Sequence, residues 1–250
     1  MAKNMKAIRR YSKDMKVLAV EASSLVAGVA ILDDSNLIYE GYNHHKRNHS
    51  QILMQMVENA LLASELELSD IDIIAVTCGP GSFTGLRIGI STVKGLAQAT
   101  RKKVAAVPTL DSLAHNITGF SGLVCPIMDA RRDQVYTSIY RWEDMEYKRL
   151  IPYSAMDVRK LANMLLAYNE PILFLGDGVD KYNEILLDLL GDKTIIAPPH
   201  LRLQRASSTA WVGLNLANAD KCISFYELEP FYLRKSQAEQ KKQTGKGKDE

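Results

Sequence analysis

The chain has 250 residues, of which 46% are hydrophobic and 24% are charged, and this ordinary globular usage excludes a disordered chain and a fibrous repeat. Its three cysteines (Cys78, Cys125 and Cys222) are scattered without a CxxC pair, which excludes a disulfide framework and a cysteine-rich zinc module. The net charge is only +2 and the basic residues gather at the two ends, so the body lacks the positive charge of a dedicated nucleic-acid binder.

Both ends differ from the body in composition. Residues 1–15 show no clear periodicity and are predicted to be a flexible N-terminal extension, and the Lys-, Gln- and Gly-rich residues 235–250 are predicted to be a disordered tail. The body is predicted to divide into an N-terminal lobe over 16–110 and a C-terminal lobe over 111–234. No apolar run reaches the roughly 18 residues of a membrane span, and no apolar segment follows the basic start, so we expect a cytoplasmic protein.

The first half of the body alternates β-rich runs with helical patterns. Its predicted elements are strands at Lys16–Val20, Val26–Asp33 and Leu37–Tyr42, a helix at Ser50–Glu65, a strand at Ile71–Thr77, a glycine-rich turn at 79–85, a helix at about 86–100, a strand at Val104–Val107 and a short helix near 110–116.

The second half repeats this order. Its predicted elements are strands at Leu123–Met128, Val135–Tyr140 and Tyr147–Ile151, a helix at Met156–Tyr168, a strand at Ile172–Leu175, a helix at Val179–Leu190, a strand at Thr194–Ala197 and a helix at Ser208–Ala219. The duplication predicts two similar lobes with mixed sheets, as in an actin-like ATPase fold.

The sharpest local motif is CGPGSFTGLRIG at 78–89, which follows a buried strand and opens a helix. It is not a Walker A loop, because no Lys-Ser/Thr pair follows Gly85, and its GxGxxxG spacing differs from the dinucleotide fingerprint. Two interpretations stay open: a tight turn with Ser82 or Thr84 as the helix N-cap, or backbone N–H groups that face an anion. Gly176-Asp177-Gly178 allows the same two interpretations.

Candidate catalytic groups are few, and no catalytic residue is assigned. His45-x₃-His49 lies in a basic turn without an acidic neighbour. Asp111 and His115 have the spacing of two ligands on one helix face but no evident third ligand, so they are only weak metal candidates. The charged segment Asp129–Asp133 fits a hairpin turn best.

Two helical segments carry unusual surfaces. Nine of the fourteen residues at 50–63 are apolar, which exceeds the stripe that one core requires. Helix 86–100 has small residues four apart, at Gly85/Gly89 and at Ser91/Gly95/Ala99. Either both helices are sandwiched within one fold, or their outer faces bury against a partner chain.

Five segments of the body resemble the TsaB (YeaZ) family, the accessory subunits of bacterial tRNA threonylcarbamoyladenosine synthesis: CGPGSFTGLRIG, LAVEASSLVAGVAIL, NHSQILMQMVENALL, STVKGLA and VPTLDSLA. The likeness covers about residues 16–234. It implies an actin/hexokinase/Hsp70-like α/β fold of two ribonuclease-H-like lobes with mixed sheets.

The resemblance also implies partners. These are TsaD, which transfers threonylcarbamoyl to the adenosine next to the anticodon in tRNAs reading codons that begin with adenine, the ATPase TsaE, and a second copy of the chain. The implied contacts use the two unusual helices, tRNA is bound only indirectly, and no cofactor is required. The predicted partner-binding residues are Ile52, Leu53, Met56, Val57, Ala60, Arg87, Ile90, Lys94 and Ala97.

Two departures from related enzymes imply a non-catalytic scaffold. TsaD carries a His-x₃-His metal pair where this chain has Asp111 and His115, and actin-like ATPases carry Asp-x-Gly where it has Glu21-Ala22-Ser23. The alternatives are a small actin-like ATPase or sugar kinase, a degenerate metallopeptidase-like protein, and a tRNA binder that uses its basic tails. The candidate residues for weak nucleotide binding are Ser23, Gly79, Gly81, Gly176 and Gly178.

Overall fold

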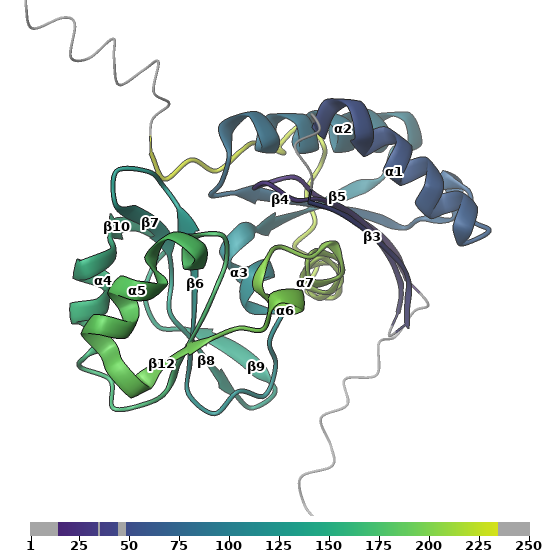
Figure 1. Cartoon of the computed structure of the whole chain (residues 1–250). Helices are drawn as coiled ribbons and strands as arrows, with labels where there is room; N and C mark the ends of the chain where they lie inside the picture. Colours follow the sequence, from purple (N-terminus) through teal and green to yellow (C-terminus); the bar gives the residue numbers. More distant parts are fainter. Residues whose placement is uncertain (1–14, 35, 45–48, 235–250) are drawn as a thin grey trace, which may run out of the picture.

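The computed structural model describes residues 15–34, 36–44 and 49–234, which form two lobes, each built on a mixed sheet (Figure 1). The predicted extension (except Met15), the predicted tail and His45 lie outside the described residues. The first-lobe elements, in chain order, are β1 (Lys16–Glu21), β2 (Ala27–Asp33), β3 (Asn36–Asn43), α1 (His49–Ala63), the 3₁₀ helix η1 (Leu68–Asp70), β4 (Ile73–Gly79), α2 (Phe83–Thr100), β5 (Lys103–Pro108) and α3 (Thr109–Ala114).

The chain then builds the second sheet and the helices on it, and the last of its described helices returns to the first sheet. These elements are β6 (Leu123–Asp129), β7 (Gln134–Thr137), β8 (Tyr140–Glu143), β9 (Glu146–Arg149), β10 (Ser154–Asp157), α4 (Val158–Leu165), β11 (Ile172–Leu175), α5 (Gly178–Leu190), the 3₁₀ helix η2 (Gly191–Lys193), β12 (Thr194–Ile196), α6 (Pro199–Arg202) and α7 (Ala206–Asn218). Within the described ranges, no helix combines the length and the apolar character that crossing a bilayer would require.

The predicted duplication is confirmed by the topology. The first sheet has the order β3-β2-β1-β4-β5, and the path β10-β7-β6-β11-β12 repeats it in the second sheet. In both, the two pairings on one side of the first strand in sequence are antiparallel and the two on its other side are parallel. Each lobe is therefore ribonuclease-H-like, and the pair forms an actin/hexokinase-like fold.

The third strand of the second lobe was misplaced by the sequence analysis. The predicted strand Tyr147–Ile151 corresponds to β9, which pairs only with β8 in an inserted hairpin, and β10 occupies the third position. The predicted helix start at Met156 was also too early. Asp157 ends β10 and caps α4, because its carboxylate accepts the backbone N–H groups of Arg159 at 2.8 Å and Lys160 at 3.1 Å.

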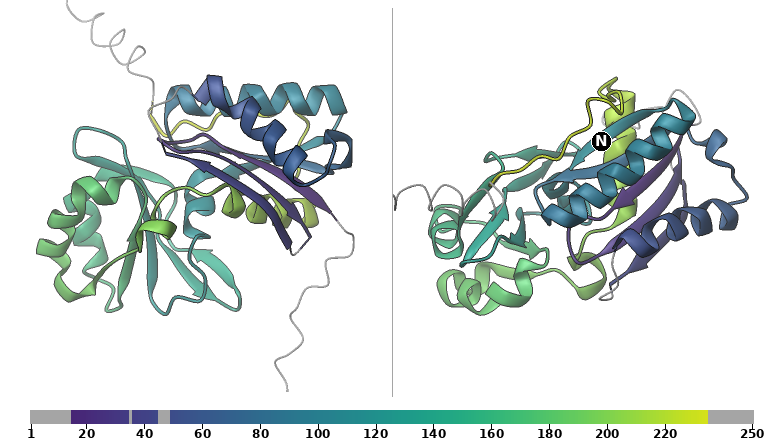
Figure 2. Two further views of the ribbon diagram at one scale, coloured as in Figure 1. Left: turned by 45° about the vertical axis from the view of Figure 1, so that its right-hand side comes forward. Right: turned by 90° about the horizontal axis from the view of Figure 1, so that it is seen from above.

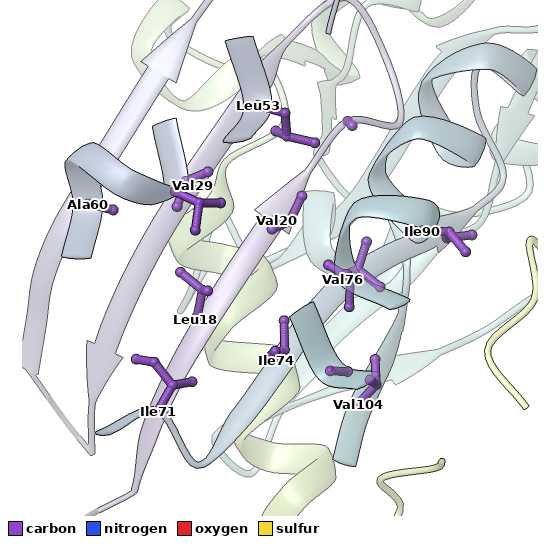
Figure 3. Close-up of a cluster of buried hydrophobic side chains, with 14 of the residues drawn as sticks. Leu18, Val20, Val29, Leu53, Ala60, Ile71, Ile74, Val76, Ile90 and Val104 are labelled. Atoms are coloured by element: carbon purple, nitrogen blue, oxygen red, sulfur yellow. The ribbon is translucent and has the colours of Figure 1, made fainter. Parts of the chain in front are cut away.

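Helices α1 and α2 lie side by side over one face of the first sheet, and α7 covers the other face (Figure 2). Between these two helices and the sheet lies a core of aliphatic residues, which come from α1, α2 and the strands β1, β2, β4 and β5 (Figure 3). In the second lobe, α4 and α5 cover one face of the sheet, while α3 and α6 pack on the other. Helices α3 and α7 contact each other between the two sheets.

The return of α7 corrects the predicted lobe boundary. The segment 111–234 is not one lobe, because α7 packs on β1, β4 and β5 of the first sheet. Gly213 permits this close approach: a Cβ there would lie 2.6 Å from the Cβ of Ala75. Residues 222–234 also lie along the first lobe, where Ile223 bridges to Val104 and Leu228 is fully buried.

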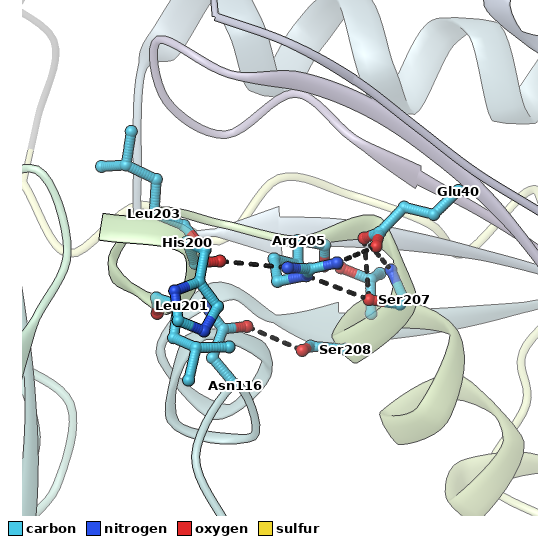
Figure 4. Close-up of polar contacts among 9 residues, drawn as sticks. Glu40, Asn116, His200, Leu201, Leu203, Arg205, Ser207 and Ser208 are labelled. Atoms are coloured by element: carbon cyan, nitrogen blue, oxygen red, sulfur yellow. Dashed lines mark hydrogen bonds and ion pairs between the residues drawn. The ribbon is translucent and has the colours of Figure 1, made fainter. Parts of the chain in front are cut away.

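A polar cluster fixes the start of α7 (Figure 4). Glu40 on β3 accepts the backbone N–H of Ser207 at 3.1 Å and its hydroxyl at 2.7 Å, and it also pairs with the guanidinium of Arg205. Glu40 therefore acts as an N-cap supplied by a distant strand. Asn116 accepts the hydroxyl of Ser208 at 2.7 Å, which joins the end of α3 to the same turn.

Candidate functional site

The glycine-rich turn at 79–85 holds the start of α2 against neighbouring backbone. Gly79 has a φ of +128°, and a Cβ there would lie 2.1 Å from the carbonyl oxygen of Phe231. A Cβ at Gly85 would lie 2.1 Å from the carbonyl oxygen of Ala22. Real Cβ atoms do not approach this closely, so both positions require glycine.

Ser82 is the N-cap of α2, which settles the choice between Ser82 and Thr84. Its hydroxyl accepts the N–H of Gly85 at 3.3 Å, and its own N–H donates to the carbonyl oxygen of Ser23 at 2.7 Å. A Cβ at Gly81 would lie 2.3 Å from that same oxygen. Gly81 and Gly85 therefore allow the turn to pack closely against the backbone that follows β1.

The second pair of glycines, Gly176 and Gly178, also packs closely against backbone. A Cβ at Gly176 would lie 2.1 Å from the carbonyl oxygen of Ile127, and one at Gly178 would lie 3.0 Å from it. Asp177 between them accepts the N–H of Asp129 at 3.2 Å. Four of the five nucleotide candidates thus pack closely against protein backbone: Gly79, Gly81, Gly176 and Gly178.

The fifth candidate, Ser23, lines a cleft of about 630 Å³ between the lobes, together with Gly81. Its walls come from the turn after β1, the first turn of α2, the β6–β7 turn and the last described residues of the chain. The basic side chains of this cleft are Arg87, which was predicted as a partner-binding residue, and Arg131, Arg132 and Arg234, for which no binding role was predicted. Asp129 and Asp177 also line it.

Below the cleft lies a buried carboxyl group. Glu21 is fully buried, and its Oε1 accepts the N–H of Ser23 at 2.6 Å and the hydroxyl of Ser23 at 2.5 Å. Burial raises the pKa of Glu21 to about 7, and the hydrogen bonds from Ser23 and Thr209 oppose this rise. Glu21 therefore occupies the end of β1 as a desolvated acid among hydroxyl groups.

A pH dependence of stability follows from this pKa. Between about pH 4.5 and pH 7, the folded chain holds a proton on Glu21 that the unfolded chain has lost, so the free energy of unfolding falls as pH rises through this window. The shift corresponds to roughly 3 kcal/mol. We expect Glu21→Gln to lack this component. Urea unfolding of both proteins at pH 5, 6, 7 and 8 measures the difference, and parallel profiles would contradict the prediction.

Asp111 is engaged by protein side chains. Its two carboxylate oxygens accept the hydroxyls of Tyr140 at 2.6 Å and Tyr153 at 2.7 Å, and the guanidinium of Arg149 lies 3.8 Å away. His115 Nδ1 lies 2.7 Å from the backbone oxygen of Asp111 in the same helix. Among the residues that the structure describes, no three His, Cys, Asp or Glu side chains gather in a way that could hold a metal ion.

The structure separates the inner and outer faces of α1 and α2. Five predicted partner-binding residues are at most 5% exposed and pack in the core of their own lobe: Leu53, Val57, Ala60, Ile90 and Ala97. Ile52, Met56 and Lys94 are half-buried, and Arg87 is exposed.

Residues outside the predicted set supply the exposed apolar and small positions of the two helices. Met54 is 51% exposed and Leu62 is 79% exposed, and the small residues Ser91, Gly95 and Ala99 are exposed on α2. We call these five residues the α1–α2 face. The two ridges of small residues thus differ in role, because Gly85 and Gly89 serve packing within the lobe and the other ridge faces outward.

The chain resembles known proteins along most of its length. Residues 43–242 match the family model described as TsaD, tRNA N6-adenosine threonylcarbamoyltransferase. The chain is 34% identical to the tRNA threonylcarbamoyladenosine biosynthesis protein TsaB of Bacillus subtilis, over 91% of this chain and 97% of that protein. It is 33% identical to TsaB of Escherichia coli over 52% of this chain and 57% of that protein.

A solved structure agrees with these sequence matches. YeaZ from Pseudomonas aeruginosa superposes with a TM-score of 0.74 at 25% identity, over 88% of this chain and 100% of that chain. The sequence likeness spans both lobes, and the superposition covers the same two-lobe architecture. The chain also matches the family model described as TsaD, and it belongs to the TsaB (YeaZ) family of tRNA threonylcarbamoyladenosine biosynthesis proteins.

Proposed function

We propose that the chain is a non-catalytic scaffold subunit that binds TsaD and, with TsaE, supports addition of threonylcarbamoyl to the adenosine next to the anticodon. The substrates are tRNAs that read codons beginning with adenine, and the work takes place in the cytoplasm. The relatives in Bacillus subtilis and Escherichia coli are named for biosynthesis of this modification, which supports the assignment of the pathway. The chain requires no cofactor of its own.

The side-chain contacts support the non-catalytic part of the proposal. Asp111, at the position of the first metal-binding histidine of TsaD, already accepts hydrogen bonds from Tyr140 and Tyr153. The glycines that would hold a phosphate in an actin-like ATPase are packed against the backbone of Phe231 and Ile127. These contacts support a chain without catalytic chemistry of its own.

The observation that carries the partner role is the α1–α2 face. Met54 and Leu62 expose large apolar surface, and nothing lies within 4 Å of a Cβ placed at Gly95. A ridge of small residues lets another helix approach closely, and two helices from each chain would form a four-helix contact. Isologous pairing makes a homodimer. TsaD, which shares the fold, would use the same face, so the two assemblies compete.

Two substitutions test this face. Met54→Lys places a charge in the contact, and Gly95→Leu fills the space that a partner helix would occupy. We expect each to weaken both dimerisation and TsaD capture at least about tenfold, which corresponds to about 1.4 kcal/mol. The monomer should stay folded, because the positions of Met54 and Gly95 are both exposed to water.

Leu187→Lys is the matched control, because Leu187 is a helical leucine of the second lobe with 48% exposure. Light scattering measures the dimer, a pull-down measures TsaD binding, and circular dichroism checks the fold. Folded Met54→Lys and Gly95→Leu variants that still dimerise and still bind TsaD would refute the assignment. Loss of only one assembly would refute the shared face.

A further inference from the structure

Four arginines that are far apart in the sequence converge on the cleft between the lobes. Arg87 lies on the first turns of α2, Arg131 and Arg132 form the β6–β7 turn, and Arg234 is the last described residue of the C-terminal segment. We call these four residues the arginine cluster. The charge distribution along the sequence gives no sign of it, because only two of the four are adjacent.

Two members of the arginine cluster are held in place by neutral groups. Arg87 Nε donates to the hydroxyl of Tyr232 at 3.1 Å, and Arg234 donates to the carbonyl oxygen of Ala130 at 2.9 Å. Each guanidinium carries five N–H groups, so both keep donors for a ligand. Tyr232 in turn stacks on Phe83, with ring centroids 4.0 Å apart.

The other two members project from a turn and are exposed. Arg131 and Arg132 both have positive φ values, of 63° and 52°. The nearby carboxylates form ion pairs with a lysine, since Lys181 lies 3.3 Å from Asp129 and 3.9 Å from Asp133. Counting only ion pairs between described residues, no carboxylate neutralises any of the four arginines. Their positive charge is therefore available to an external anion.

The arrangement favours a polyanion that passes across the mouth of the cleft over a small phosphate that enters it. Asp129 and Asp177 also line the cleft and would repel a small phosphate that enters it, and the glycines of the two turns pack closely against backbone. Three of the arginines, Arg87, Arg131 and Arg132, are exposed, and Arg234 is half-buried. The guanidinium group of arginine is planar and binds phosphates through paired hydrogen bonds. Aromatic side chains beside such groups are typical of nucleic-acid surfaces.

We propose that the arginine cluster binds backbone phosphates of the tRNA substrate. The inference rests on the proposed function, which brings tRNA to the partner subunit. Helix α2 links the two surfaces, because it carries Arg87 near its start and Ser91, Gly95 and Ala99 on its outer face. The cluster therefore shares a helix, through Arg87, with the face proposed for the partner that acts on tRNA. The sequence-based expectation is different, because it has the chain contact tRNA only indirectly.

The test removes two charges with Arg131→Ala/Arg132→Ala. The matched control, Arg159→Ala/Lys160→Ala, removes two exposed charges from α4 in the second lobe. Fluorescence anisotropy with labelled tRNA, between about 50 and 300 mM salt, gives the affinity of the full chain alone and in complex with TsaD. We expect the cluster variant to reduce the slope of log K against log salt by about 1.5 and to lower the affinity about tenfold at low salt. The control should match wild type.

Each other outcome has a defined meaning. An affinity and a salt slope equal to wild type in a folded cluster variant would overturn the proposal. Loss of TsaD capture by that variant, with tRNA binding by the chain itself unchanged, would overturn it in favour of an acidic surface on the partner protein. Failure of the wild-type chain to capture TsaD would refute the proposed function instead, and the salt slope of the chain alone would still decide the role of the cluster.

Discussion

Gly85→Ala is expected to destabilise the chain by about 3 kcal/mol, whereas Gly95→Ala in the same helix is expected to stabilise it by about 0.5–1 kcal/mol. A Cβ at Gly85 would lie 2.1 Å from the carbonyl oxygen of Ala22, so β1 or α2 must move to admit it. A Cβ at Gly95 meets nothing within 4 Å. There, alanine only reduces the backbone freedom of the unfolded chain and raises helix propensity.

Urea unfolding of the two variants and wild type measures both effects with one method. Because the substitution and the helix are the same, intrinsic helix propensity acts in the same direction at both sites and cannot explain opposite signs. Alanine substitutions that shift the free energy of unfolding in the same direction would contradict the packing assigned to Gly85. Such a result would reopen the interpretation of the 79–85 turn as an anion-binding loop.

The sequence predicted the duplicated fold well because the repeated elements carry local signals. Strands β1, β4 and β11 are buried on both faces and appear as continuous apolar runs, and turn residues separate the antiparallel strands. The inserted hairpin β8–β9 was mistaken for part of the repeat, because strand propensity does not say which sheet position a strand fills. The return of α7 to the first sheet depends on Gly213 meeting Ala75, which is a contact between distant segments.

The outward faces of α1 and α2 could not be read from periodicity. Apolar residues surround α1 on most sides, so Leu53 and Met54 look equivalent in the sequence although they are 1% and 51% exposed. Local sequence patterns also cannot predict the arginine cluster or the tyrosines around Asp111, because their members come together only when the chain folds. The sequence showed two ridges of small residues at four-residue spacing in α2. It did not show which of the two faces solvent.

Asp111→Ala is expected to cost about 3 kcal/mol or more of stability while the modification rate of the folded, assembled complex stays within about twofold of wild type. Two hydroxyls donate to this carboxylate, from Tyr140 at 2.6 Å and Tyr153 at 2.7 Å, and hydrogen bonds to charged groups contribute about 1.5–3 kcal/mol each. Tyr140 is only 2% exposed, so its hydroxyl would be left buried without an acceptor. His115→Ala should cost less, because the ring bonds only within its own helix.

A double-mutant cycle separates this structural role from a chemical one. Tyr140→Phe removes the orphaned hydroxyl, so Asp111→Ala/Tyr140→Phe should be less destabilised than the sum of the two single variants, by at least about 1 kcal/mol. Urea unfolding gives the stabilities, and a threonylcarbamoylation assay below the unfolding temperature of each variant gives the rates. Additive stabilities would show that the two side chains do not depend on each other. A hundredfold loss of modification by an intact, folded complex would instead return Asp111 to the role of a metal ligand, because a carboxylate that only orients two tyrosines has no part in the reaction.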